Sequence, residues 1–196
     1  VDRGNISTLA AGPSPDGLLV PTGTTGGVVD VVASLGTSTL SRQVFVKLTA
    51  QQNGANANAP GESGQIACAS ADRGSNGGVG GVGGEGLEGA VTDPPTLTAL
   101  QTPSSDGSAQ NLKLLYPSDK TVWPRGMLAP LLMWSWTTND ADAIQIQLST
   151  TSGSFTWTGT FARPAILTQT GGAFIRHPIP EDVWKMATDT ASIKIL

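Results

Sequence analysis

The sequence predicts an all-β protein of two β-sandwich modules, the first incomplete, joined by a long linker rich in Gly, Ala and Ser. Two observations support this prediction. Short stretches in which apolar and polar residues alternate recur in the first part of the chain and again in its last part, and Gly, Pro, Asn and Asp punctuate them as turns. Between these parts no periodicity is sustained. We therefore assign the modules to residues 1–50 and 109–196, and the linker to residues 51–108.

The first module contains too few strands to close a sandwich by itself. In the last of its candidate strands Val44, Val46 and Leu48 share one face. A closed sandwich has about seven strands in ~100 residues. We therefore expect this module to be incomplete, with unpaired strand edges. Its four candidate strands cover residues 6–10, 18–20, 28–35 and 40–49.

The linker is dominated by Gly, Asn, Ala, Ser and Pro. Structureless segments longer than ~12–15 residues are uncommon inside compact domains, so the linker is either a spacer or a strap that lies along neighbouring surfaces. We favour the strap, with residues 66–69, Leu87 and residues 97–100 as its apolar anchors. Cys68 is the only cysteine, which excludes an internal disulfide. It is interpreted either as a small buried side chain or as an attachment point.

The second module begins with the densest apolar block of the chain, residues 112–148. A helical turn is predicted at 181–188, because Pro180 and the two acidic residues after it suit the first turn of a helix. The strands on either side form an antiparallel arrangement, and the last one is expected to continue beyond residue 196. Strands are predicted at 112–116, 131–136, 144–148, 155–161 and 192–196.

The first module carries the patterns Gly-x-Ile-Ser, Gly-Leu-Leu-Val-Pro and Gly-Gly-x-Val-x-Val-x-Ala. With them, it resembles the C-terminal part of a bacterial group 2 immunoglobulin-like domain. The resemblance implies a β-sandwich whose first strands precede this chain. The matching residues are Gly4, Ile6, Gly17, Leu18, Pro21, Gly26, Gly27, Val29, Val31 and Ala33.

The second module carries Leu-Tyr-Pro at 115–117, Thr-Val-Trp-Pro-Arg-Gly at 121–126 and Arg-His-Pro-Ile-Pro at 176–180. It also carries Ala-Pro-Leu-Leu at 129–132, Trp134-Ser135 and Trp184. With these residues it resembles the fibronectin type III-like or immunoglobulin-like modules of large multidomain surface proteins of Gram-negative bacteria. The resemblance implies an extracellular, cell-surface or periplasmic location. Such proteins can carry a β-propeller or a Cys-x-x-Cys-His haem site, and neither is present in this sequence.

The charge of the chain disfavours one large class of partner. The formal net charge is −4 and the pI is about 4.8. There is no basic stripe to release counterions from phosphate, so no nucleic-acid partner is predicted. No apolar run approaches the ~20 residues that a membrane-spanning helix needs, so no membrane span is predicted.

No catalytic, cofactor-binding or metal-binding residue is predicted. The G-x-G-x-x-G match at 78–83 is surrounded by further glycines, whereas a dinucleotide site needs a strand before it and a helix after it. His177 is the only histidine, lies between Arg176 and Pro178 in a predicted loop, and has no G-x-S-x-G nucleophile motif to serve, so a structural or surface role is favoured. The turn with Asn139, Asp140 and Asp142 lacks the spacing of a calcium loop and is interpreted as turn chemistry. We expect the chain not to be an enzyme.

All five tryptophans lie in the second module. Alternation places Trp134 and Trp136 on the same face of one strand. Core packing is the favoured role of the tryptophans as a set, with a partner interface or sugar stacking as alternatives. The candidate contacts for a partner or a sugar are Trp123, Trp136 and Trp157.

The predicted function is that of a structural or interaction module, which builds or decorates an assembly through sheet edges and apolar patches. Its partners are other protein chains, or missing parts of the same protein, that pair with free β-edges. The alternative is an accessory module that binds carbohydrate or a partner for a larger enzyme or haem protein.

Overall fold

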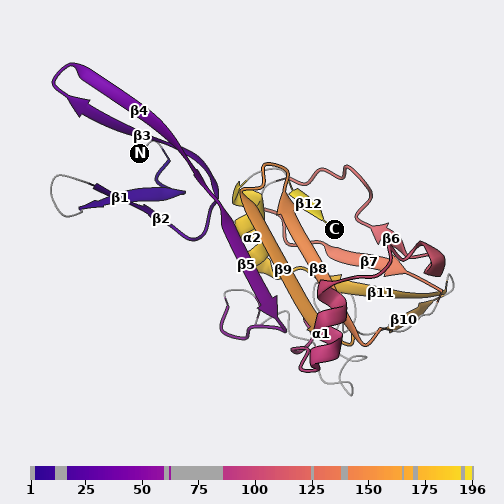
Figure 1. The fold of residues 1–196 in the computed structure, drawn as a ribbon. Coiled ribbons are helices and arrows are strands. Elements are labelled where there is room, and N and C mark those ends of the chain that lie inside the picture. Colours follow the sequence, from indigo (N-terminus) through magenta and orange to yellow (C-terminus); the bar gives the residue numbers. More distant parts are fainter. Residues whose placement is uncertain are drawn as a thin grey trace. The chain divides into compact units, whose positions relative to one another are not determined.

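The computed structural model describes residues 3–11, 17–59, 62, 86–124, 126–137, 141–164, 166–169, 172–190 and 193–195. These residues form a predominantly β fold with two short helices, α1 (Pro94–Gln101) and α2 (Glu181–Thr190) (Figure 1). The all-β class expected from the sequence is therefore confirmed in its coarse form. No helix among the described residues is long and apolar enough to cross a membrane.

The chain divides into two compact units, and each is made from segments that are distant in the sequence. Unit 1 comprises Val1–Ala50, Gln147–Trp157 and Met186–Leu196. Unit 2 comprises Gln51–Ile146 and Thr158–Lys185. The predicted boundaries at residues 50 and 108 stay a prediction.

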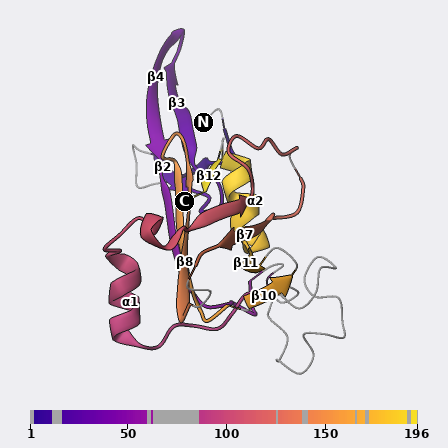
Figure 2. The ribbon, with the colours of Figure 1, turned by 90° about the vertical axis from the view of Figure 1, so that its right-hand side faces the viewer.

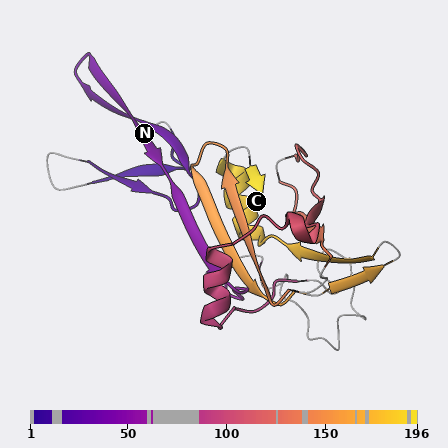
Figure 3. The ribbon, with the colours of Figure 1, turned by 45° about the vertical axis from the view of Figure 1, so that its right-hand side comes forward.

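Two hairpins account for most of the first fifty residues. One joins β1 (Ser7–Ala11) and β2 (Gly17–Pro21), and the other joins β3 (Gly27–Leu35) and β4 (Ser38–Val46) (Figures 1 and 3). Both pairs are antiparallel. Within the described residues each hairpin is a sheet of only two strands.

Two further sheets have four strands each. The first has the order β12-β8-β9-β5, formed by β12 (Ile193–Ile195), β8 (Ala143–Thr150), β9 (Phe155–Ala162) and β5 (Leu48–Asn53). The second has the order β10-β11-β7-β6, formed by β10 (Ile166–Gln169), β11 (Gly172–Pro178), β7 (Leu131–Ser135) and β6 (Lys113–Tyr116). Figure 2 shows β7 and β11 side by side, and their pairing is antiparallel.

Alternation along the strands produces the core that the sequence predicts. Along β8 the even-numbered side chains from residue 144 to residue 150 are buried, whereas the odd-numbered ones are more exposed. A strand with one buried face has this period of two. The same rule holds for β9 at its first three odd-numbered positions. The buried apolar residues of the two strands are Ile144, Ile146, Leu148, Phe155, Trp157 and Phe161.

The first difference from the predicted elements lies at residues 40–49, where the sequence indicates one strand. The structure divides this range between β4 and β5 at Lys47. The chain changes partner there, because β4 pairs with β3 whereas β5 belongs to the sheet of β9. The amide of Leu48 then donates to the carbonyl of Ser154 (2.9 Å).

The second difference is the helix α1, which lies inside the predicted linker. Asp93 is its N-cap, and its carboxylate accepts from the Thr96 amide (2.9 Å) and hydroxyl (2.6 Å). Pro94 and Pro95 occupy the first helical positions, where no amide donor is needed. The helix has no buried residue, so it lacks the apolar period by which helices are recognised in a sequence.

A further part of the predicted linker, residues 86–91, is held by hydrogen bonds from its backbone to the Asn53 side chain and to the backbone of β9. Asn53 forms two bonds with Val91, one as donor (3.0 Å) and one as acceptor (2.8 Å). The amide of Ala162 donates to the carbonyl of Gly89 (2.8 Å). Leu87 is buried, as the strap interpretation expects of an anchor. Of the other two predicted anchors, residues 97–100 lie in α1, where no residue is buried, and residues 66–69, with Cys68, lie outside the described residues.

We expect Gly54→Ala to destabilise the protein strongly. Gly54 has a φ of +79°, and a Cβ there would overlap the backbone of Ala90. A left-handed alanine and an overpacked contact together should lower the free energy of unfolding by about 2–4 kcal/mol. Urea denaturation would measure this loss. Gly89→Ala is the matched control, since a Cβ at Gly89 meets nothing within 4 Å. Equal stability of the two variants would contradict the prediction.

Candidate interaction site

The β3–β4 hairpin exposes several apolar side chains on one of its two faces. Val28 pairs with Phe45 in the antiparallel register, and Val32 pairs with Ser41 on the same face. Val28, Val32 and Phe45 are 40%, 48% and 51% exposed. We call these three residues the hairpin patch. A valine or phenylalanine side chain gains ~1.5–3 kcal/mol on full burial, so the patch is a favourable surface for contact.

The opposite face of the hairpin is covered only near its base. Val29 and Val46 are buried with Ile6 in a small apolar cluster, against which Leu19 and Val44 pack. Toward the tip, the same face ends at Leu35 and Leu40, which are both highly exposed. This face of the hairpin is therefore packed near its base and exposed to solvent near its tip.

The strand β6 forms a second exposed apolar edge. It is the end strand of its sheet, because β7 is its only partner among the described strands. Its residues Leu114, Leu115 and Tyr116 are all exposed, and the register shifts between Leu114 and Tyr116. An exposed apolar edge strand presents unpaired backbone groups to other strands.

The three tryptophans predicted to contact a partner or a sugar differ in their surroundings. Trp157 is 1% exposed, so its ring belongs to the core and is not accessible to a ligand in this structure. Trp123 is half-buried and packs edge-to-face against Trp184, with ring centroids 5.4 Å apart. The indole N–H of Trp184 donates to the carbonyl of Met127 (3.0 Å). Only Trp136 lines an open pocket.

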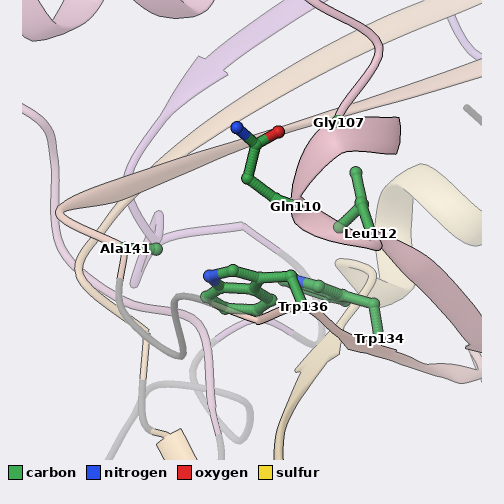
Figure 4. Close-up of a pocket in the computed structure, with 6 residues that line it drawn as sticks. All are labelled: Gly107, Gln110, Leu112, Trp134, Trp136 and Ala141. Atoms are coloured by element: carbon green, nitrogen blue, oxygen red, sulfur yellow. The ribbon is translucent and has the colours of Figure 1, made fainter.

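That pocket has a volume of about 260 Å³ and opens to solvent. Trp134 and Trp136 lie on one side of it, and Gln110 and Leu112 lie on the other (Figure 4). As alternation predicts, the two indoles lie on the same face, Trp134 within β7 and Trp136 directly after it. The complete lining consists of Gly107, Gln110, Leu112, Trp134, Trp136 and Ala141.

A short turn builds the second wall of the pocket. The 3₁₀ turn η3 (Ser108–Gln110) follows Gly107, which has a φ of +75°. A Cβ added at Gly107 would lie less than 3 Å from the Leu112 side chain, so only glycine fits there. The Leu112 amide donates back to the Gly107 carbonyl (3.0 Å). Thr137, just beyond β7, donates to the Gln110 carbonyl from its amide (2.8 Å) and its hydroxyl (2.9 Å). These bonds fasten the turn to the strand that carries the indoles.

This wall was not predicted from the sequence. Residues 107 and 108 fall in the predicted linker, and nothing in the spacing of Gly107 or Gln110 links them to the tryptophans. The one available signal was turn chemistry at Asp106-Gly107, where the Ser108 amide donates to the Asp106 carboxylate (2.9 Å).

His177 is fully buried, in a strand and not in the loop expected from the sequence. It lies in β11, pairs with Leu132 of β7, and packs against Phe161 with ring centroids 4.6 Å apart. The reason is the local alternation, in which Ile175 and His177 point into the core. A carbonyl can only accept, so Nδ1 carries the proton in its 2.8 Å hydrogen bond with the Pro178 oxygen.

The other ring nitrogen of His177, Nε2, is buried without a hydrogen-bond partner among the described residues. Burial disfavours the charged imidazolium and lowers the pKa of His177 to about 4, although the bond to Pro178 opposes this shift. The ring is therefore neutral at ordinary pH. It has no nearby nucleophile in the described part of the chain.

Glu62 is a second buried ionisable group, 1% exposed. Its Oε2 accepts from the Gln52 side-chain amide (2.8 Å) and from the Asn56 backbone amide (2.7 Å), which holds the turn after β5. Burial and the neighbouring Asp182 carboxylate raise the pKa of Glu62.

The remaining sequence candidates add no site to these. The glycine match at 78–83 and the residues Asn139 and Asp140 lie outside the described residues, and Asp142 contacts Arg163 at the surface (3.3 Å). Among the described residues, no group of three or more His, Cys, Asp or Glu side chains could hold a metal ion.

Comparison with known proteins found no family model, no curated protein and no solved structure that matches this chain.

We expect the stability of the protein to fall as the pH drops from about 6.5 toward 4, and His177 to cause part of this loss. Its folded pKa lies below its ordinary value, so its stabilising contribution is present above pH 6.5 and is lost as the pH falls. The full difference corresponds to roughly 3 kcal/mol. Urea denaturation of wild type and His177→Phe at several pH values measures it. Parallel pH profiles for the two proteins would contradict this role.

Glu62→Gln should stabilise the protein at neutral pH, by about 1 kcal/mol. The glutamine oxygen can keep both accepted bonds, and its amide can donate to Asp182 without a like charge. Because the folded pKa of Glu62 is raised, the wild type gains from protonation at low pH and loses that gain as the pH rises above 4.5. The difference between variant and wild type should therefore shrink in acid. Thermal unfolding at pH 4 and pH 7 tests this, and destabilisation by the variant at pH 7 would contradict it.

Proposed function

We propose that this chain is a structural or interaction module that joins an assembly by pairing its exposed β-edges with strands of other polypeptide. The observation that carries the proposal is the β3–β4 hairpin, which is a sheet of only two strands among the described residues and bears the exposed hairpin patch. The partner strand is supplied by another chain or by another part of the same protein.

A two-stranded ribbon lacks further strands that would help to bury its apolar side chains. An isolated hairpin is marginally stable in water, and three or more strands with an apolar face are needed for independent stability. Here Val29 and Val46 are the only buried side chains of the two nine-residue strands. A strand added from a partner would form hydrogen bonds with the backbone groups at the outer edge of the hairpin. Other parts of the same partner would cover the hairpin patch.

The edge of β6 supports the same function independently. Its apolar side chains Leu114, Leu115 and Tyr116 are exposed beside a backbone edge that no described strand pairs with. Native proteins usually protect such edges with charges, prolines or bulges. A bulge is present between Leu114 and Tyr116, and it limits pairing to a short stretch.

The proposal extends to the kind of module and its location. The glycine and valine pattern of the first module and the Trp-Pro-Arg-Gly stretch of the second support immunoglobulin-like and fibronectin type III-like modules of an extracellular or cell-surface bacterial protein. The six strand pairs for which the structure gives a register among the described residues are all antiparallel, and this supports sandwich modules of that kind.

We expect Val32→Lys/Phe45→Lys to weaken assembly about tenfold. Both side chains are exposed, so the fold of the chain itself should be unaffected. The measurement is hydrogen exchange over residues 27–46, with sedimentation, on protein isolated from its natural host with its partners. The wild type should show slow exchange at the outer edges of the hairpin in the assembly and fast exchange after dissociation.

Ser34→Lys/Gln43→Lys is the matched control, because these two polar residues lie on the same face and the variant gains the same charge. It should assemble more like the wild type than the variant of the hairpin patch does. If exchange over residues 27–46 is equally fast in the assembly and in the separated chain, edge pairing by this hairpin is ruled out.

A further inference from the structure

We propose that the pocket between Trp134, Trp136 and Gln110 binds one neutral pyranose ring of a carbohydrate. The inference does not depend on the pairing of β-edges, since it concerns side chains on the face of a sheet. It rests on the chemistry of the lining, on the way the two walls are fastened, and on the volume of the site.

The aromatic wall is suited to the C–H face of a sugar. Trp134 and Trp136 are two residues apart along an extended chain, so their attachment points are ~7 Å apart on one face. The face of an indole ring carries negative charge density and attracts weakly positive C–H groups. Trp134 is held in the middle of its sheet, because it pairs with Leu114 on one side and Ile175 on the other. A platform on a strand is more rigid than one on a loop.

The opposite wall supplies the polar group that a sugar needs. The amide of Gln110 offers donors and an acceptor, which match hydroxyl groups that both donate and accept. No hydrogen bond to the Gln110 side chain occurs among the described residues, whereas its backbone carbonyl is held by Thr137. The backbone of Gln110 is thus held in place, whereas its amide points away from the two indoles in Figure 4, so rotation of this exposed side chain is needed to bring the amide to a ring stacked on them.

Charge and size narrow the ligand further. None of the six lining residues is charged, which favours a neutral sugar over an acidic one. The volume of about 260 Å³ is below the ~300–1,000 Å³ of pockets that enclose a drug-sized ligand. One ring fits in the pocket while the rest of an oligosaccharide extends into solvent.

A proline-rich peptide is the competing ligand, since such peptides also dock in aromatic grooves. A proline residue offers only its carbonyl, which can accept from the Gln110 amide nitrogen, whereas sugar hydroxyls can also donate to the amide oxygen. The lining therefore favours the sugar, and the peptide becomes an outcome of the experiment.

The experiment is calorimetric titration of the purified chain with cellotetraose, chitotetraose and mannotetraose, and with a decaproline peptide. We expect at least one tetrasaccharide to bind with a Kd of about 1 mM, as suits a single stacked ring. Trp136→Ala should weaken binding about tenfold, and Trp136→Phe should restore most of it because an aromatic face remains. Gln110→Ala should weaken binding about fivefold.

Val122→Ala is the control, because this highly exposed apolar residue lies outside the pocket, and it should bind like the wild type. Gln110 is exposed, so its variant tests the site even if Trp136→Ala fails to fold. The proposal is overturned if no tetrasaccharide binds at about 10 mM. It is equally overturned if Gln110→Ala binds as tightly as the wild type and Trp136→Phe/Gln110→Ala binds as tightly as Trp136→Phe, or if decaproline alone binds and depends on Trp136.

Discussion

Burial of alternate side chains along β8 and β9 is the constraint on which the rest of the fold depends. The two strands carry the largest apolar side chains of the core, including Phe155 and Phe161, with no exposed surface on either. A slip of one residue would turn this whole set toward water, so the register is strongly specified. The turn between the strands reinforces it, since the Phe155 amide donates to the Thr150 hydroxyl (3.0 Å).

The β3–β4 hairpin shows what happens where this constraint is missing. Val28 and Val29 are neighbours in sequence, yet Val29 is buried and Val28 is not. Apolar residues on both faces are typical of strands that are covered on both sides. The hairpin has this composition, although a second covering layer is absent among the described residues. The proposal of an added strand follows from this mismatch between composition and surroundings.

Much of the fold could be predicted from period-two alternation, and the failures have physical causes. The strands predicted at 144–148 and 155–161, and the helical turn at 181–188, correspond to β8, β9 and α2. Helix α1 was missed because it buries nothing, so only its Asp-Pro-Pro cap marked it. Partner changes are equally invisible to alternation, which is why the exchange of sheets at Lys47 was read as one strand.

The candidate sites were harder to predict, because alternation assigns a face without saying what lies above it. It placed Trp134 and Trp136 together correctly, but Trp157 alternates equally well and is buried. What makes Trp134 and Trp136 line a pocket is the second wall. This wall includes Gln110, which lies in a segment without periodicity. His177 was misjudged for a related reason, since the prolines that surround it indicate a loop while β7 pairs with its strand.

A strand added to β6 and a sugar in the pocket are physically compatible, although β6 pairs with the strand that carries Trp134. Backbone groups at a strand edge point within the plane of the sheet, whereas side chains stand roughly perpendicular to it. A strand added to the outer edge of β6 would therefore extend the sheet without covering the indole of Trp134, which lies one strand further in on β7. Edge pairing recognises backbone and carries little sequence specificity, while the pocket recognises ring faces and hydroxyl groups. A chain anchored by its edges would thus keep its pocket available for a sugar.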